Sequence, residues 1–167
     1  MLTGVTQMYL ESEMALDGSL FDPEYRLFLS FVLEHDYYGI PIEYITEVKS
    51  WADVKIRPLV KAPDFLLGVF NLRGNIVPVV DLRKKWDCVH QEFDSRTAII
   101  ILAIQKHMWA VVVDGIKEVA GLKKEQIMVP PALNANRNES TLMLLDIEKV
   151  MTSDEMGLIE NANELAP

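Results

Sequence analysis

The chain has 167 residues, about the length of one domain, which excludes a large multidomain enzyme. Half of the residues are hydrophobic and a quarter are charged, so the chain can build a packed core and is not disordered as a whole. The chain has 16 Lys and Arg and 25 Asp and Glu, which gives a net charge of -9. A negative net charge disfavours binding to nucleic-acid phosphates. Cys88 is the only cysteine, so an intramolecular disulfide is excluded.

The first segment, residues 1–23, mixes acidic, small and scattered apolar side chains and stops at the turn signal Asp22-Pro23. We interpret it as an N-terminal arm. The segment lacks the basic and apolar regions of a signal peptide, and no apolar stretch of the chain approaches the ~20 residues that span a bilayer. The sequence therefore favours a cytoplasmic protein.

From residue 24 the chain consists of short runs rich in Val, Ile, Leu and aromatic residues, separated by Gly, Pro and Asp. These runs predict β-strands over 26–33, 37–42, 44–49, 66–72, 75–80, 97–104, 108–113 and 141–145. Runs of this length and spacing are typical of an all-β barrel or sandwich. We expect this β domain to cover residues 24–152.

The chain also repeats itself. The segment 38-YGIPIEYITEV-48 matches 109-WAVVVDGIKEV-119 in its aromatic start, its acid at the sixth position and its closing Glu-Val. In each copy a proline follows (Pro58, Pro130), then an apolar strand that ends in Asp (79–81, 144–146). The distance between proline and aspartate is shorter in the second copy, by about one strand. The repeat predicts two similar modules, and the shorter second copy predicts that its module lacks one strand.

The C-terminal segment, residues 153–167, has apolar residues at helical spacings, including Met156 and Ile159. Ser153 and Asp154 precede them as a possible N-cap pair. The pattern predicts a C-terminal helix or tail that covers one face of the β domain.

Three aspartates, Asp81, Asp114 and Asp146, follow apolar strands, and three carboxylates at strand ends could bind a metal or perform acid-base hydrolysis. Aspartate at a strand end is more often a turn former or a helix N-cap. The sequence contains no nucleophile elbow and no phosphate-binding glycine loop, and its three histidines lack the spacing of a metal site. We expect no enzyme activity, no metal and no cofactor, and keep a metal-assisted hydrolase as the alternative.

One segment, 68-GVFNLRGNIVPVVDLR-83, stands apart because two glycines bracket a strand that carries Asn71 and Arg73. Together with 38-YGIPI-42 and the Glu-Val pair, it resembles the CheW family of bacterial chemotaxis coupling proteins, whose signature reads Gly-Val-x-Asn-Leu-Arg-Gly. The resemblance continues in the family's order from about Tyr25 to Met151, and takes in 110-AVVVDGIKEV-119, 127-IMVPP-131 and 143-MLLDIEKVMTSDEM-156.

The resemblance implies two intertwined five-stranded barrels of SH3-like type and a non-catalytic adaptor. Such an adaptor bridges the cytoplasmic tips of chemoreceptors and the regulatory domain of the histidine kinase CheA. It implies partner binding through Ile45, at the position associated with the kinase, and through Glu47, Val48, Gly68 and Arg73. It also places Glu47 and Arg73 on neighbouring strands, as an ion pair. A coupler of another kinase system is the alternative within this class.

This sequence departs from the family pattern where the repeat is short, because 132-ALNANRNES-140 is too polar and too brief to supply the expected strand. A missing strand leaves an unpaired sheet edge. We therefore expect the N-terminal arm or a second copy of the chain to cover that edge, the latter as a homodimer through the shortened module.

Overall fold

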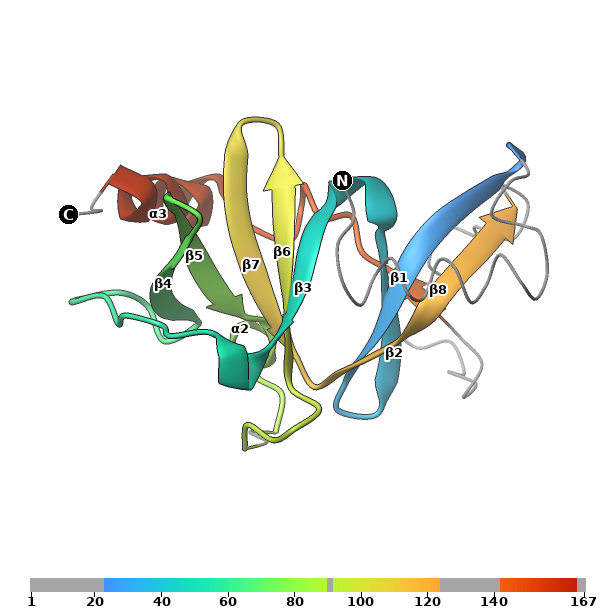
Figure 1. Cartoon of the computed structure of the whole chain (residues 1–167), viewed down its shortest axis with the longest axis horizontal. Coiled ribbons are helices and arrows are strands. Elements are labelled where there is room, and N and C mark those ends of the chain that lie inside the picture. The colour runs from blue at the N-terminus through green and yellow to red at the C-terminus, as the bar shows by residue number, and fades with distance from the viewer. Residues whose placement is uncertain (1–22, 90–91, 124–141, 165–167) are drawn as a thin grey trace.

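The structure, a computed structural model, describes residues 23–89, 92–123 and 142–164. Within these residues the chain is mostly β, with two sheets side by side and a helix near the C-terminal end (Figure 1). None of the helices in these described segments is long and apolar enough to cross a membrane.

The smaller sheet has four strands in the order β8-β1-β2-β9. They are β1 (Tyr25–Leu33), β2 (Asp36–Pro41), β8 (Gly115–Lys123) and β9 (Leu142–Leu144). Strand β1 pairs antiparallel with β2 and β8, whereas β9 pairs parallel with β2.

The larger sheet has five strands in the order β3-β6-β7-β5-β4. They are β3 (Ile45–Ser50), β4 (Leu66–Leu72), β5 (Asn75–Asp81), β6 (Ala98–Ile104) and β7 (His107–Val113). Strands β5 and β7 are parallel, and the other pairs are antiparallel. The helical elements are η2 (Ile42–Tyr44), η3 (Trp51–Asp53), α2 (Leu82–Lys85) and α3 (Ser153–Glu164).

The predicted repeat is present, and it links the two sheets in opposite directions. The first copy starts in β2 of the smaller sheet and crosses to β3 of the larger one, whereas the second starts in β7 and crosses back to β8. Strands β5 and β9 are equivalent as well, because β5 pairs parallel with β7 as β9 does with β2, although β9 ends two residues before Asp146. Each sheet therefore combines strands from both halves of the chain.

The expected missing strand corresponds to β4, which lies between β3 and β5 in the chain. Its counterpart would lie between β8 and β9, in residues 124–141, so the expectation for 132–140 falls outside the described residues. The described part of the smaller sheet has four strands against five in the larger one.

Strands β6 and β7 are buried on both faces, which explains why their sequences are almost uninterrupted apolar runs. One face contributes Ile100, Leu102 and Val111 to a core shared with the smaller sheet and α3. The other face contributes Ile99, Ile101 and Val112 to a second core, within the larger sheet. A backbone bridge between Arg57, beyond β3, and Val69 of β4 links the two edges of that sheet.

Two local expectations differ from the structure. Strand β8 is absent from the predicted runs, because Gly115, Lys117 and Glu118 interrupt the apolar pattern of a half-exposed strand. The cap of α3 is Thr152 and not Ser153 or Asp154. The Thr152 hydroxyl accepts a hydrogen bond from the Glu155 amide (3.2 Å), and the Glu155 carboxylate accepts one from the Thr152 amide (3.0 Å).

Candidate partner-binding surface

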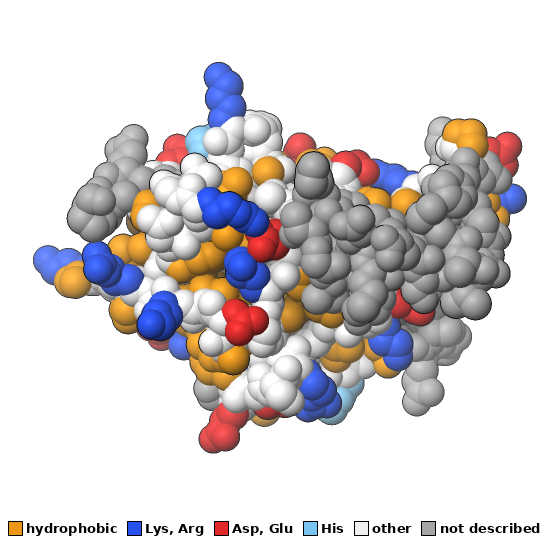
Figure 2. All heavy atoms as spheres, in the orientation of Figure 1, with side chains coloured by type: hydrophobic (Ala, Val, Ile, Leu, Met, Phe, Trp, Pro, Cys, Tyr) orange, Lys and Arg blue, Asp and Glu red, His pale blue; other side chains and the backbone are white. Residues whose placement is uncertain are grey.

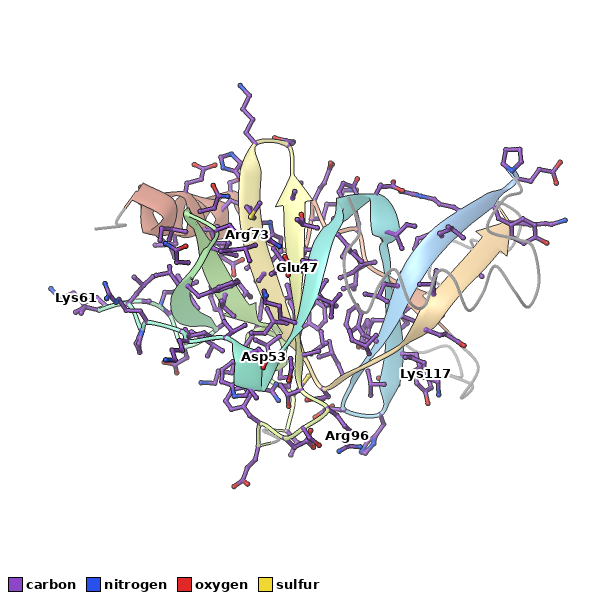
Figure 3. All side chains as sticks on the ribbon, in the orientation of Figure 1. Glu47, Asp53, Lys61, Arg73, Arg96 and Lys117 are labelled. Atoms are coloured by element: carbon purple, nitrogen blue, oxygen red, sulfur yellow. The ribbon has the colours of Figure 1, made fainter. Side chains whose placement is uncertain are left out.

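Glu47 and Arg73 form the expected ion pair. Both Arg73 guanidinium NH2 groups donate to the same carboxylate oxygen, Glu47 Oε2, at 2.8 and 2.6 Å. The contact lies between β3 and the tip of the β4–β5 hairpin (Figure 3). Strands β3 and β4 are the two edges of the larger sheet and not adjacent in its hydrogen-bond order, so the pair spans those edges.

The hairpin turn fixes where Arg73 stands. Arg73 and Gly74 are the two loop residues between β4 and β5, and both have positive φ angles, 48° and 89°. Two successive positive φ angles are characteristic of the type I′ turn, whose twist matches that of the flanking strands. The Asn71 side chain accepts a hydrogen bond from the Gly74 amide at 2.8 Å and supports the turn. The Asn-Leu-Arg-Gly sequence thus presents an arginine at a rigid hairpin tip.

A β-bulge determines which residues of β3 face the core. The pairing of β3 with β6 shifts register between Ile45 and Glu47, which adds one residue to β3. Ile45 and Val48, three positions apart, both lie in the shared core as a result. Glu47 is directed away, to the pair with Arg73. Ile45 is only 5% exposed, so its side chain contributes to the interior of the fold.

Glu47 is held between two cations. Its second oxygen, Oε1, lies 3.1 Å from Lys49 Nζ. The Glu47 side chain is only 11% exposed, whereas that of Arg73 is 62% exposed. The carboxylate is therefore a largely covered support, and the guanidinium is the group that the solvent or a partner meets.

A shallow pocket of about 500 Å³ adjoins the pair. Val54, Phe70 and Leu72 provide its apolar residues, and Lys49, Lys55 and Arg73 provide cations at its lining, together with Asp53 and Asn71. On this face of the larger sheet, basic side chains surround exposed hydrophobic atoms (Figure 2). The arrangement suits a protein surface that presents carboxylates around an apolar side chain.

Gly68 has a structural role beneath this surface. Its φ angle is +147°, and a Cβ atom added to it would lie 2.2 Å from the Arg57 carbonyl oxygen. That carbonyl accepts a hydrogen bond from the Val69 amide at 2.9 Å, within the bridge that links the sheet edges. Gly68 therefore permits the close approach on which the position of the β4–β5 hairpin depends.

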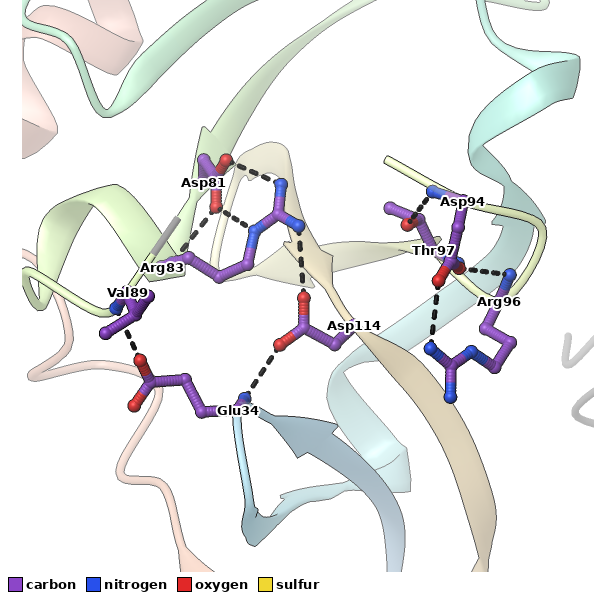
Figure 4. Close-up of polar contacts among 8 residues, drawn as sticks. All are labelled: Glu34, Asp81, Arg83, Val89, Asp94, Arg96, Thr97 and Asp114. Carbon is purple, nitrogen blue, oxygen red and sulfur yellow. Dashed lines mark hydrogen bonds and ion pairs between the residues drawn. The ribbon is translucent and has the colours of Figure 1, made fainter. Parts of the chain in front are cut away.

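The three aspartates do not form one cluster. Asp81 is the N-cap of α2 and accepts a hydrogen bond from the Arg83 amide at 3.0 Å, as the turn-forming interpretation predicts. Asp114 is joined to Asp81 through the Arg83 guanidinium, which donates to both carboxylates (Figure 4). Asp146 instead lies on the surface, with its Oδ2 atom 3.3 Å from Lys149 Nζ. Among the described residues no group of three metal-ligand side chains comes together.

Arg83 is a buried structural residue that the sequence pattern did not predict. It is 1% exposed, and its bonds to Asp81 and Asp114 join the end of β5 to the crossing from β7 to β8. Asp114 in turn accepts a hydrogen bond from the Glu34 amide, in the β1–β2 turn (Figure 4). Burial lowers the pKa of Arg83, but the hydrogen bonds to both aspartates outweigh burial and raise the pKa above its ordinary value.

Two aromatic residues cover this buried network. Phe93 stacks on Trp51 with ring centroids 3.8 Å apart, and the Arg83 guanidinium lies 4.7 Å from the Phe93 ring. A third aromatic residue, Trp109, is almost fully buried and packs in the shared core. The Asp-Leu-Arg sequence at the end of β5 was the available signal for Arg83, but an arginine that follows an apolar strand is usually solvated.

Comparisons with known proteins agree with this picture. A model of the CheW-like domain matches residues 27–155. The chemotaxis protein CheW of Klebsiella aerogenes is 36% identical over 145 residues, which cover 80% of this chain and 86% of the relative. That of Treponema pallidum is 27% identical over 155 residues, covering 84% and 89%. The crystal structure of scaffolding protein TtCheW from Thermoanaerobacter tengcongensis has a TM-score of 0.65 and 26% identity, covering 72% of this chain and 88% of that one.

Proposed function

Because the chain belongs to the CheW-like domain family and is a non-catalytic chemotaxis scaffolding protein, we propose that it bridges chemoreceptors and the histidine kinase CheA in the cytoplasm. The hydrolase alternative built on Asp81, Asp114 and Asp146 is withdrawn, since the family is non-catalytic and Arg83 neutralises two of the three carboxylates.

The proposal includes the finer architecture of two intertwined SH3-like barrels. The crossing of the two repeat copies between sheets supports the intertwining. The bridge between Arg57 and Val69, with a separate core inside the larger sheet, supports closure of one barrel. We retain the division into an arm (1–23), a β domain (24–152) and a C-terminal helix or tail (153–167). Homodimerisation through the shortened module also remains a prediction.

The observation that carries the partner-binding proposal is the exposed Arg73 guanidinium, fixed by Glu47 beside an apolar pocket. A guanidinium in a defined orientation is a strong recognition group for carboxylates, and arginine is frequent among interface hot spots. Ile45, Val48 and Gly68 act on binding through the fold: the first two support β3 from the core, and Gly68 positions the hairpin.

Reconstitution from purified parts tests the proposal. The regulatory domain of CheA, a chemoreceptor cytoplasmic fragment and this chain are mixed in all combinations, and complexes are separated by size and by calorimetry. We expect the chain to bind each partner alone and to bring them into one complex. Binding to the receptor without binding to CheA would favour the alternative, a coupler of another kinase system, and binding to neither would reject the proposal.

A further inference from the structure

A basic loop at one end of the larger sheet presents an apolar side chain to solvent. Residues 55–63 contain three bases and no acid, with prolines at 58 and 63. Leu59 and Ala62 pack against the shared core, so the residues between them are directed outward. Val60 is 90% exposed, and Lys61 has a φ angle of 61°. A positive φ angle is costly for lysine and is kept only where the surrounding chain fixes it.

The loop is held firmly at its base. Arg57 and Val69 exchange two backbone hydrogen bonds of 2.7 and 2.9 Å, and the Leu66 amide donates to the Pro63 carbonyl at 3.0 Å. Lys61 stands at the outer tip of this loop (Figure 3). The basic and apolar tip, formed by Val60 and Lys61, is thus a pre-organised surface, which reduces the entropy lost on binding.

Helix α3 has the complementary character. Its sequence, SDEMGLIENANE, contains four acids and no base. Ile159 and Ala162 are the buried residues of the helix, whereas its Leu158 is 40% exposed. Glu160 lies toward the C-terminal half, where the helix dipole already contributes negative potential and a cation would be favourable. Glu160 Oε1 lies 3.2 Å from His107 Nε2, and this contact is an ion pair only when the histidine is protonated.

Both surfaces lie at the same end of the molecule, α3 beside β4 and β5 and the basic loop below it (Figure 1). A two-fold axis between two copies at this end would place each loop on the helix of the other copy, so that both contacts form together. We propose that a second copy of this chain docks here, with Val60 against Leu158 and Lys61 against Glu160 of α3. This surface belongs to the first module and is distinct from the homodimer predicted through the second.

A second copy fits better than an unrelated partner because this chain carries both complementary surfaces at one end. Within the described residues, no ion pair engages Arg57 or Lys61. An acidic membrane would also attract the basic tip, but the neighbouring acidic helix would be repelled by the same surface.

The test is the oligomeric state of the full chain, measured by sedimentation equilibrium from micromolar to millimolar concentration. We expect a reversible dimer that weakens with added salt, since exposed charges are screened. Val60→Asp and Lys61→Glu should each raise the dimer dissociation constant at least tenfold. Glu160→Lys should do the same, because it places a cation opposite the basic loop.

Mixing two weakened variants provides the decisive measurement. In a dimer of Lys61→Glu with Glu160→Lys, one contact has both charges exchanged and the other has both parent charges, so both are attractive. The mixture should dimerise about as well as the parent, although neither variant does so alone. Val89→Asp, at another valine that is 78% exposed, and Lys117→Glu, on β8 at the other end of the molecule, serve as controls and should leave the dimer unchanged.

Three results would overturn the proposal. They are a chain that remains monomeric at every concentration, a dimer that Val60→Asp and Lys61→Glu leave intact, and a mixture of the two charge variants that stays monomeric. Vesicles with acidic lipids serve as a separate probe, and salt-sensitive binding to them that depends on Lys61, without a dimer, would assign the loop to a membrane instead. None of these measurements involves the kinase or the receptor, so their outcome is independent of the proposed function.

Discussion

Removal of the Arg73 side chain should weaken partner binding strongly and change the stability of the fold only slightly. Arg73→Ala removes an ion pair in which the arginine is 62% exposed, and Lys49 remains beside Glu47 to keep that carboxylate paired. We expect the free energy of unfolding to change by only about 0 to 1 kcal/mol. Affinity for the kinase or the receptor fragment should fall at least tenfold, as calorimetry can measure.

The control for this prediction is Arg96→Ala, because Arg96 also forms an exposed ion pair, with Asp94 at 2.9 Å, but lies away from the hairpin (Figure 3). It should leave both affinities at the parent value. If Arg73→Ala binds both partners like the parent, the site assignment is wrong, and if it unfolds the protein, Arg73 is a structural residue.

Ile45 behaves differently, because its side chain lies in the shared core and is 5% exposed. Ile45→Asp buries a carboxylate without a partner and should lower the free energy of unfolding by roughly 3 kcal/mol or more, so any loss of kinase binding would follow from unfolding. Ile45→Val should cost only about 1 kcal/mol. Urea denaturation of both variants checks this. A stable Ile45→Asp variant that has lost kinase binding alone would show that the residue contacts the kinase directly.

At the scale of the element, Gly68 determines whether the edges of the larger sheet can meet. Gly68→Ala places a Cβ atom 2.2 Å from the Arg57 carbonyl oxygen, on backbone that cannot move without breaking the bridge. We expect the free energy of unfolding, measured by urea denaturation, to fall by more than about 2 kcal/mol. Gly74→Ala is the matched control, because its φ angle is also positive but its Cβ would meet no atom within 4 Å. Equal losses in both variants would contradict a specific role for the close approach.

The docking of α3 should depend on pH through Glu155. Burial raises the pKa of this carboxyl, but hydrogen bonds from Lys85 and Thr152 outweigh burial and lower the pKa below its ordinary value. A lowered folded-state pKa stabilises the fold above the ordinary value, and this contribution disappears as the pH falls through the folded-state pKa. Stability should therefore decline below about pH 4.

In Glu155→Gln the free energy of unfolding should fall less steeply in that acid range, since the amide does not titrate. Denaturation at pH 7 and at several acid values compares the slopes of parent and variant. Identical slopes would show that Glu155 contributes no acid sensitivity.

The whole molecule is joined by the buried charges around Arg83. Arg83→Met leaves Asp81 and Asp114 without their shared cation, and breaking a buried pair in this way costs about 3 to 5 kcal/mol. Because the network extends from β5 of the larger sheet to the β1–β2 turn of the smaller one, both sheets should lose stability together. Hydrogen exchange resolved by strand measures this, and loss of protection in one sheet only would show that the network does not couple them.

Sequence alone determined the β class, most strand positions, the internal repeat, the C-terminal helix and the chemotaxis scaffold family, because these depend on local apolar patterns and short motifs. The tertiary structure decided the rest. It turned the repeat into two crossings between sheets. It also revealed a bulge that places Ile45 and Val48 in the shared core and directs Glu47 away from that core, to its pair with Arg73. It also buried Arg83, since the carboxylates that balance its charge come from residues 2 and 31 positions away and meet only after folding.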